Sequence, residues 1–259
     1  MPSAAGSAVT VFRASIGAGV LRDSLEAASI LVDEGRFKVS RGELTLRAVD
    51  AANVAMVAIS LAAKGFEKFE GREAEFGVDL KKFLEFLGMA EGADRVEIEV
   101  DDEARKLHLV LGNLKASLGL LDLAHIRKDP TIPPLDLPAR VRLAGADFRT
   151  GIRAAEKVSD YLALAVEEDA FAMEAKGDTD RVRLEIPKAS LIELKWASKP
   201  SKIRSLYSLD YLSDMTKAIG KAPEVSLELG SDYPVKMKFE VAGGKGSVEY
   251  LLAPRIENE

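Results

Sequence analysis

Leu21-Arg-Asp-Ser-Leu-Glu-Ala-Ala-Ser-Ile-Leu-Val-Asp33 has a counterpart 127 residues later in Phe148-Arg-Thr-Gly-Ile-Arg-Ala-Ala-Glu-Lys-Val-Ser-Asp160. The two segments align without a gap, so that Leu25 meets Ile152 and Asp33 meets Asp160. A repeat period of about half the chain is too long for a solenoid, whose units run to roughly 20–50 residues. The two segments therefore predict two copies of one domain.

A second pair of segments supports the duplication. Val78-Asp79-Leu80 opens a helical pattern that gives way to alternating residues at Val96–Val100, and Leu209-Asp210-Tyr211 does the same before Val225–Leu229. We expect Asp79 and Asp210 to cap these helices, because a short carboxylate accepts hydrogen bonds from the first free helix amides. The prolines between 133 and 138 mark a boundary. It divides the chain into a flexible N-terminal extension (1–8), an N-terminal domain (9–117), a connector (118–137) and a C-terminal domain (138–259).

Most of each half consists of short segments in which apolar and polar residues alternate, which is typical of strands with one buried face. About two helices per half carry an apolar stripe that would lie against a sheet. The predicted fold class is α+β, with two similar domains of antiparallel sheets and two helices each. The alternating segments are Val9–Ser15, Phe37–Ser40, Leu44–Val49, Val54–Leu61, Val96–Val100, Leu107–Leu111, Arg140–Leu143, Val182–Ile186, Leu191–Trp196, Val225–Leu229, Val235–Val241 and Ser247–Leu252.

The composition excludes much enzyme chemistry. The 259 residues include no cysteine and only two histidines, His108 and His125, which excludes disulfides, thiolate catalysis and cysteine-ligated zinc. The Gly243-Gly244-Lys245-Gly246 run lacks the strand-then-helix context of a phosphate-binding loop and is typical of a hairpin. We therefore expect no catalytic residues, no metal site and no cofactor.

Charge and hydropathy limit the possible partners. A formal charge of −6 argues against avid nucleic-acid binding over the whole surface, so any DNA contact must be local. No run approaches the roughly 18 uncharged apolar residues of a membrane span, and no secretory leader precedes the first expected strand. We expect a protein of the cytoplasm with no membrane partner.

Several stretches resemble the proliferating cell nuclear antigen (PCNA) family of DNA sliding clamps, and the resemblance covers nearly the whole chain. Leu251-Leu-Ala-Pro-Arg-Ile-Glu257 is similar to the family's closing signature, and Arg47-Ala-Val-Asp50 resembles a loop region of its first half. The segments Leu123–Pro133 and Tyr211–Met215 look like those of archaeal members. The resemblance implies a head-to-tail homotrimeric ring around duplex DNA, associated with the nucleoid in an archaeon or nuclear in a eukaryote.

In such a ring the helices line the central hole, so cations on their polar faces would face DNA. Lys217 and Lys221 also suit the end of a helix without any DNA, because cations there interact favourably with the helix dipole. A solvated helix surface is the alternative interpretation for every member of the set. The DNA-facing residues implied by the resemblance are Arg22, Lys81, Lys82, Arg149, Arg153, Lys157, Lys217 and Lys221.

Clients of the family insert a short motif with aromatic side chains beside the connector. Proline in the connector favours an extended segment, and apolar residues could contact a client. An ordinary linker and an ordinary last strand are the alternative, and Asn53 and Leu251 depart from the family pattern. The expected partner-binding residues are Val49, Asn53, Val54, Leu120, Leu123, Ile126, Ile132, Pro133, Pro234, Leu251, Leu252, Ala253, Pro254 and Arg255.

The family joins its subunits by pairing edge strands, which also hides edges that would otherwise aggregate. The expected interface residues are Lys115, Ala116, Ser117, Leu118, Arg181, Val182, Arg183 and Leu184. The resemblance further implies non-sequence-specific contact with duplex DNA. The implied protein partners are a replicative DNA polymerase, a clamp loader, a flap endonuclease, a DNA ligase and other proteins with the same docking (PIP) motif. A subunit of a heterotrimeric or checkpoint-type clamp is the alternative.

Overall fold

The computed structural model describes residues 10–90, 95–129, 132, 134–197 and 202–256. The expected flexible extension, residues 1–8, lies outside this range, as does Pro133. The chain forms two compact units. The first holds the described residues up to Ala48, Ala58–Asp129 and Val241–Gly246, and the second holds Val49–Val57, the described residues from 132 to Glu240, and Ser247 onward.

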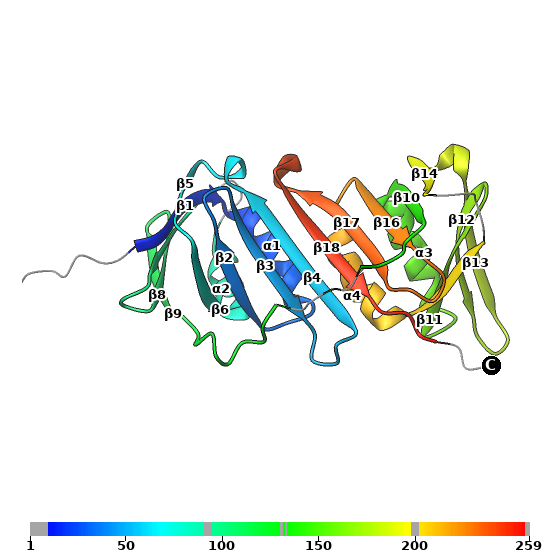
Figure 1. Ribbon diagram of the computed structural model, residues 1–259, viewed down its shortest axis with the longest axis horizontal. Helices are drawn as coiled ribbons and strands as arrows, with labels where there is room; N and C mark the ends of the chain where they lie inside the picture. The colour runs from blue at the N-terminus through cyan, green and yellow to red at the C-terminus, as the bar shows by residue number, and fades with distance from the viewer. Residues whose placement is uncertain (1–9, 91–94, 130–131, 133, 198–201, 257–259) are drawn as a thin grey trace, which may run out of the picture. The chain divides into compact units, whose positions relative to one another are not determined.

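The two halves of the chain repeat one succession of elements (Figure 1). The first half comprises β1 (Thr10–Gly17), α1 (Ala18–Ser29), β2 (Glu34–Val39), β3 (Glu43–Val49), β4 (Ala55–Ala62), η1 (Ala63–Gly65), β5 (Lys68–Gly71), β6 (Ala74–Asp79), α2 (Leu80–Leu87), β7 (Arg95–Asp101), β8 (Lys106–Leu111) and β9 (Leu114–Gly119). The second comprises β10 (Ala139–Ala144), α3 (Gly145–Ala155), β11 (Tyr161–Glu167), β12 (Ala170–Lys176), β13 (Arg181–Pro187), η2 (Lys188–Ser190), β14 (Glu193–Trp196), β15 (Ile203–Ser208), α4 (Leu209–Ile219), β16 (Glu224–Leu229), β17 (Val235–Val241), η3 (Ala242–Gly244) and β18 (Gly246–Leu252).

Strand pairing repeats as well. Five strands follow the order β5-β1-β7-β8-β9 in the first half and β14-β10-β16-β17-β18 in the second. The other four strands follow the order β4-β3-β2-β6 in the first half and β13-β12-β11-β15 in the second. Each described strand of the first half therefore has a counterpart in the second half that occupies the same position in its order. The duplication and the α+β class predicted from the sequence are therefore confirmed.

The helices of each half pack against each other and against the sheets. Their buried faces carry the apolar stripes read from the sequence, including Leu21 and Leu25 on α1 and Phe148 and Ile152 on α3. In the first unit the Phe37 and Phe76 rings stack with their centroids 5.4 Å apart. Within the described residues, no helix is long and apolar enough to span a membrane.

Matching backbone bonds show how closely the two copies agree. The first amide of α2, on Leu80, donates to the Asp33 carbonyl at 2.9 Å, and the first amide of α4, on Leu209, donates to the Asp160 carbonyl at 2.9 Å. Asp33 and Asp160 are the last residues of the two repeated segments recognised in the sequence. These bonds fix the start of the second helix in each half.

The capping predictions had opposite outcomes. The Asp79 carboxylate accepts a hydrogen bond from the Lys82 amide at 2.9 Å and caps α2, as predicted. The prediction for Asp210 was wrong, because α4 starts at Leu209, two residues before the start that an Asp210 cap requires, and its N-cap is Ser208, which makes no side-chain capping bond. Asp210 instead lies in the first turn, where a carboxylate interacts favourably with the helix dipole.

Candidate functional site

The cations on the helix surfaces form one group of candidate site residues. Lys81 and Lys82 are exposed in the first turn of α2, and Arg22 on α1 is half-buried. Arg149 and Arg153 are exposed on α3, and Lys217 on α4. The helices end earlier than the sequence pattern indicated, so Lys157 and Lys221 lie just beyond the ends of α3 and α4.

Several of these cations already have partners in the chain. The Lys81 ammonium lies 2.7 Å from an Asp33 carboxylate oxygen. Lys217 lies 2.6 Å from Asp214, and this hydrogen bond raises the pKa of the lysine. The Arg149 side chain lies over Gly220 at the end of α4, where a cation stabilises the helix dipole. A structural role and a DNA-facing role are both compatible with this geometry.

The turn between β3 and β4 is built around the Asp50 carboxylate. It accepts hydrogen bonds from the amides of Ala52 at 3.2 Å and of Val54 and Ala55 at 2.8 Å each. Asn53 sits at the top of the turn with φ 58°, in the left-handed region that asparagine tolerates better than most residues. Sequence reasoning assigned Asn53 to a client contact and missed this turn.

The turn holds the segment that follows the last strand. Leu252 ends β18 and is buried, and the Ala253 amide donates to the Val54 carbonyl at 2.9 Å. The structure therefore brings together the expected partner-binding residues Val54 and Ala253. Leu251 is half-buried on the same strand, Val49 is half-buried at the end of β3, and Pro234 is half-buried in the turn before β17.

Arg255 has a second contact that the sequence did not indicate. Its amide donates to the Leu206 carbonyl at 2.7 Å, and its guanidinium lies 4.2 Å from the centroid of the Tyr161 ring and bonds the tyrosine hydroxyl. The amides of Ala253 and Arg255 are thus used within the chain, and Pro254 has none. Because the Arg255 backbone forms an antiparallel bridge with Leu206, the carbonyl oxygens of Ala253 and Pro254 are what this closing segment, Ala253–Arg255, can offer to a ligand.

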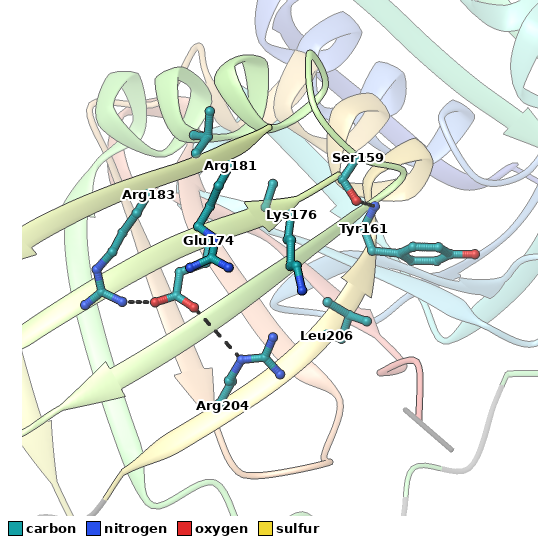
Figure 2. Close-up of a pocket in the computed structure, with 10 residues that line it drawn as sticks. Ser159, Tyr161, Glu174, Lys176, Arg181, Arg183, Arg204 and Leu206 are labelled. Atoms are coloured by element: carbon teal, nitrogen blue, oxygen red, sulfur yellow. Dashed lines mark hydrogen bonds and ion pairs between the residues drawn. The ribbon is translucent and has the colours of Figure 1, made fainter. Parts of the chain in front are cut away.

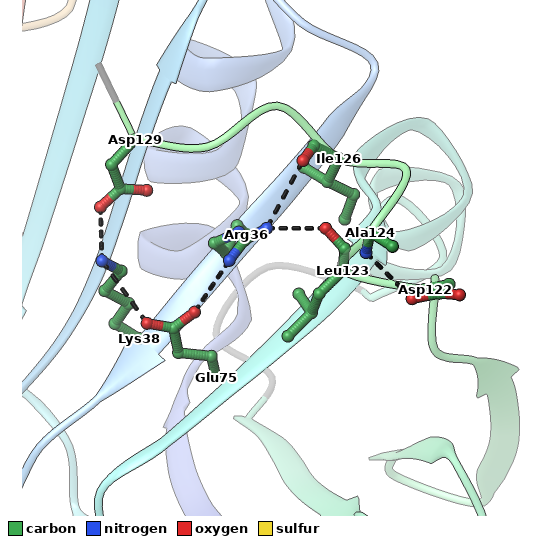
Figure 3. A network of polar contacts seen from close by, with 8 residues as sticks. All are labelled: Arg36, Lys38, Glu75, Asp122, Leu123, Ala124, Ile126 and Asp129. Carbon is green, nitrogen blue, oxygen red and sulfur yellow. Dashed lines mark hydrogen bonds and ion pairs between the residues drawn. The ribbon is translucent and has the colours of Figure 1, made fainter. Parts of the chain in front are cut away.

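The start of the connector is fixed to β2 and β6 (Figure 3). The Arg36 guanidinium donates to the Leu123 carbonyl at 2.7 Å and contacts Glu75 at 3.0 Å. The Lys38 ammonium lies 2.7 Å from Asp129, a hydrogen bond that raises the pKa of the lysine. Ile126 is buried and its carbonyl accepts a longer hydrogen bond from Arg36 at 3.4 Å, whereas Leu120, Leu123 and Ile132 are half-buried. The four residues therefore contribute less exposed apolar surface than their composition indicated.

Two edge strands carry the expected interface residues. β9 ends the first five-stranded order and holds Lys115 and Ser117, exposed, with Ala116 half-buried and Leu118 buried. β13 ends the second four-stranded order and holds Arg181 and Arg183, exposed, with Val182 and Leu184 half-buried. Each strand has a row of backbone groups with no strand beside it among the described residues.

The site contains no cluster of three or more metal-ligating side chains within the described residues. The chain does combine a duplicated α+β domain with cationic helix surfaces and two edge strands. This architecture defines the DNA-clamp class of fold. Comparison with known proteins specifies the class further.

The N-terminal domain model of proliferating cell nuclear antigen matches residues 12–126, and the C-terminal domain model matches residues 131–255. The chain belongs to the proliferating cell nuclear antigen family. The DNA polymerase sliding clamp of Methanocella arvoryzae is 50% identical over 249 residues, which cover 96% of this chain and 100% of that protein. The clamp of Methanococcoides burtonii is 47% identical with the same coverage, so the resemblance to archaeal members is confirmed.

Solved structures agree with this assignment. The structure of the C-terminal region of FEN-1 bound to A. fulgidus PCNA matches with a TM-score of 0.90 and 35% identity, covering 96% of this chain and 100% of that chain. PCNA from Thermococcus kodakaraensis matches with a TM-score of 0.87 and 25% identity, covering 95% and 100%. Both relatives share the fold over their full length.

Proposed function

We propose that the protein is a DNA polymerase sliding clamp whose three identical copies close into a ring around duplex DNA. The observation that carries the proposal is the match of both halves, over almost the whole chain, to a family whose relatives are named for this activity. The ring would tether a replicative polymerase, and it would also serve a clamp loader, a flap endonuclease and a DNA ligase. The chain would act without catalysis of its own, in the cytoplasm with the nucleoid.

Ring closure would use the two edge strands. Antiparallel pairing of β9 from one copy with β13 from the next satisfies the backbone groups that each edge leaves open. The pairing would also cover Leu114, which is 37% exposed, and the half-buried Val182 and Leu184. A heterologous contact of this kind closes when the rotation per subunit permits.

DNA would be held by topology rather than by affinity. A closed ring does not dissociate sideways, so a tethered polymerase stays at a high local concentration near its template. Contacts from Arg22, Lys81, Lys82, Arg149, Arg153, Lys157, Lys217 and Lys221 to phosphates carry no sequence information. Weak contacts of this type would permit sliding.

Clients would dock on two segments, the connector (118–137) and the segment that closes the chain. The connector would contribute Leu120, Leu123, Ile126, Ile132 and Pro133, and the second unit would contribute Val49, Asn53, Val54, Pro234, Leu251, Leu252, Ala253, Pro254 and Arg255. In the A. fulgidus relative the C-terminal region of FEN-1 is bound, so a peptide is a suitable probe. A client would donate hydrogen bonds to the carbonyl oxygens of the closing segment.

Loading onto nicked circular DNA tests the proposal. With a clamp loader and ATP, the protein should remain on the circle through gel filtration and should leave when the circle is linearised. Its native mass should be about three times 28.0 kDa. Retention on linear DNA would contradict the topological mechanism, and a persistent monomer would favour the alternative of a heterotrimeric or checkpoint-type subunit.

A further inference from the structure

A hollow of about 550 Å³ opens on one face of the sheet formed by β13, β12, β11 and β15 (Figure 2). Glu174 and Lys176 on β12 line it, whereas the alternate residues Met173 and Phe171 are buried on the other face. Met173 lies against Gly151 of α3. The hollow is therefore on the face of this sheet that the helices leave open.

The side chains around the hollow are mostly cationic. Lys176, Arg181, Arg183 and Arg204 surround the single carboxylate of Glu174. Arg183 is held between Glu174 and Glu185, and the Arg204 Nε lies 4.0 Å from Glu174. The charge of this surface is thus opposite to that of the chain, which carries −6.

Two of the cations have no acidic partner among the residues that the structure describes. Lys176 and Arg181 are opposite each other in the register of β12 and β13, and both are exposed. Within the described part of the chain, neither has a carboxylate within 4.0 Å. Like charges on directly opposite residues destabilise a sheet, so an anion bound between them would relieve this repulsion.

The hollow adjoins the closing segment. Tyr161 and Leu206 line the hollow, and they are also the two residues that Arg255 contacts through its guanidinium and its amide. A peptide that lies on the carbonyl oxygens of Ala253 and Pro254 would reach the wall of the hollow with its next few residues. Its flanking segment would then meet Lys176 and Arg204.

We propose that this hollow binds a segment rich in aspartate and glutamate that flanks the docking motif of a client. The inference rests on the proposed function, because the client is the ligand. Duplex DNA fits the hollow less well. The hollow lies on the sheet face opposite the helices that carry the proposed DNA contacts, and Lys176 and Arg181, its two cations without a described acidic partner, balance one or two carboxylates rather than a run of phosphates.

Peptide binding tests the inference. The probe is a synthetic peptide of the FEN-1 C-terminal region, extended at either end by four glutamates or, as a control, by four glutamines. Fluorescence anisotropy at low salt should show that one glutamate extension strengthens binding about three- to tenfold, as expected for two or three exposed ion pairs. The variant Lys176→Gln/Arg204→Gln should lose this gain and bind the unextended peptide as the native protein does.

The variant avoids β13, so the strand proposed to join subunits is unchanged. The matched control Lys64→Gln/Lys188→Gln removes two exposed cations elsewhere and should keep the glutamate gain. No gain at either end, or an equal gain in both variants, would overturn the inference while leaving the client dock intact. If the unextended peptide fails to bind, the proposed client dock is wrong. Binding of a free hexaglutamate peptide, lost in the Lys176→Gln/Arg204→Gln variant, then tests whether the hollow binds an acidic segment.

Covalently closed plasmid DNA, added without a clamp loader, tests whether the ligand of the hollow is nucleic acid instead of a peptide. Such a circle does not enter a closed ring, so any binding must use the outer surface. We expect no binding that depends on Lys176 and Arg204. Plasmid binding lost only in the Lys176→Gln/Arg204→Gln variant would identify a nucleic-acid site and reject the peptide proposal.

Discussion

Asp50 is the buried carboxylate that organises the turn between β3 and β4, and the closing segment is hydrogen-bonded to this turn. It is 6% exposed, and besides three backbone amides it accepts a hydrogen bond from the Tyr211 hydroxyl at 2.7 Å. Burial alone would raise its pKa, but the amides of Ala55 and Val54 and the Tyr211 hydroxyl together outweigh burial and lower the pKa below 3.8. The same bond raises the pKa of Tyr211 to about 12.

Asp50→Asn should therefore destabilise the fold in a pH-dependent way. A carboxylate whose pKa is lower in the folded state adds stability above its unfolded pKa, near 3.8, and this stability is lost as the pH falls through the folded value. Asparagine keeps the shape without the charge, so we expect a loss of about 1–3 kcal/mol at pH 7. Urea unfolding at a fixed protein concentration should show a smaller difference from the native protein at pH 3.

A suitable control is Glu103→Gln, which changes an exposed carboxylate in the turn between β7 and β8 and should leave stability unchanged at both pH values. A deficit of Asp50→Asn that is equal at pH 7 and pH 3 would show that charge is not the cause.

Residues of this kind set the limit of what the sequence predicts. Asp50 was visible as part of the Arg47–Asp50 motif, but Tyr211 lies 161 positions away and its contact depends on the tertiary fold. Arg255 was expected to offer its backbone, yet its amide and side chain are both used by Leu206 and Tyr161. Tyr161 begins a strand that the alternation pattern did not reveal, so no local signal pointed to it.

At the scale of elements, two helix glycines differ in what surrounds them. A methyl group on Gly145, at the start of α3, would come within 2.5 Å of the Ala222 carbonyl oxygen and 2.9 Å of the Ile219 carbonyl oxygen. A methyl group on Gly19, near the start of α1, would meet no atom within 4 Å. Gly145 thus permits the close approach of α3 to the end of α4.

Gly145→Ala should cost about 1–3 kcal/mol, because the clashing atoms belong to the backbone and have little freedom to move. Gly19→Ala is the matched control and should stabilise the protein by up to about 1 kcal/mol through the higher helix propensity of alanine. Thermal unfolding should shift in opposite directions for the two variants. A loss of stability in both would contradict the packing argument.

Arg36 is one of the side chains that hold the connector. Arg36 donates to the Leu123 carbonyl and contacts Glu75, a fork geometry that lysine does not reproduce. Arg36→Lys should keep the charge and the fold but increase amide hydrogen exchange in residues 123–126. The control Lys38→Arg should preserve the ion pair with Asp129 and leave exchange there unchanged. Equal exchange in both variants would remove Arg36 as the anchor.

Elements were predictable where one pattern dominated, and strands were missed where they are short, lie at a sheet edge or are buried on both faces. The helices and central strands such as β7 and β16 carry a single apolar face, so their periodicity was informative, whereas the edge strands β5 and β15 were not among the expected segments. β11 reads Leu162-Ala-Leu-Ala-Val166 with all five residues buried, which removes the alternation that identifies a strand. The Asp210 prediction was wrong because the repeat was aligned at the aspartates, whereas the structure equates Asp79 with Ser208 at the start of each helix.

At the scale of the whole molecule, the location of charge should matter more than its total. The chain carries −6, and the proposed DNA-facing cations lie on the four helices or, for Lys157 and Lys221, just beyond the ends of two of them. Among the described residues they include local ion pairs, such as that of Lys217 with Asp214, so only part of their charge remains for phosphates. The functional assignment therefore requires a comparison of equal charge changes at different places.

Arg149→Glu/Arg153→Glu/Lys157→Glu should reduce loading onto nicked circular DNA severalfold, because three phosphate contacts become repulsive. The control Lys64→Glu/Lys188→Glu/Lys238→Glu changes the net charge equally on exposed positions outside the four helices and should load normally. Native mass and thermal unfolding verify that both rings are intact.

Since Arg149 also lies over Gly220, the double variant Arg153→Glu/Lys157→Glu separates loading from helix stability. Equal impairment in the control would indicate general repulsion from DNA, and normal loading in all variants would leave these cations with a purely structural role.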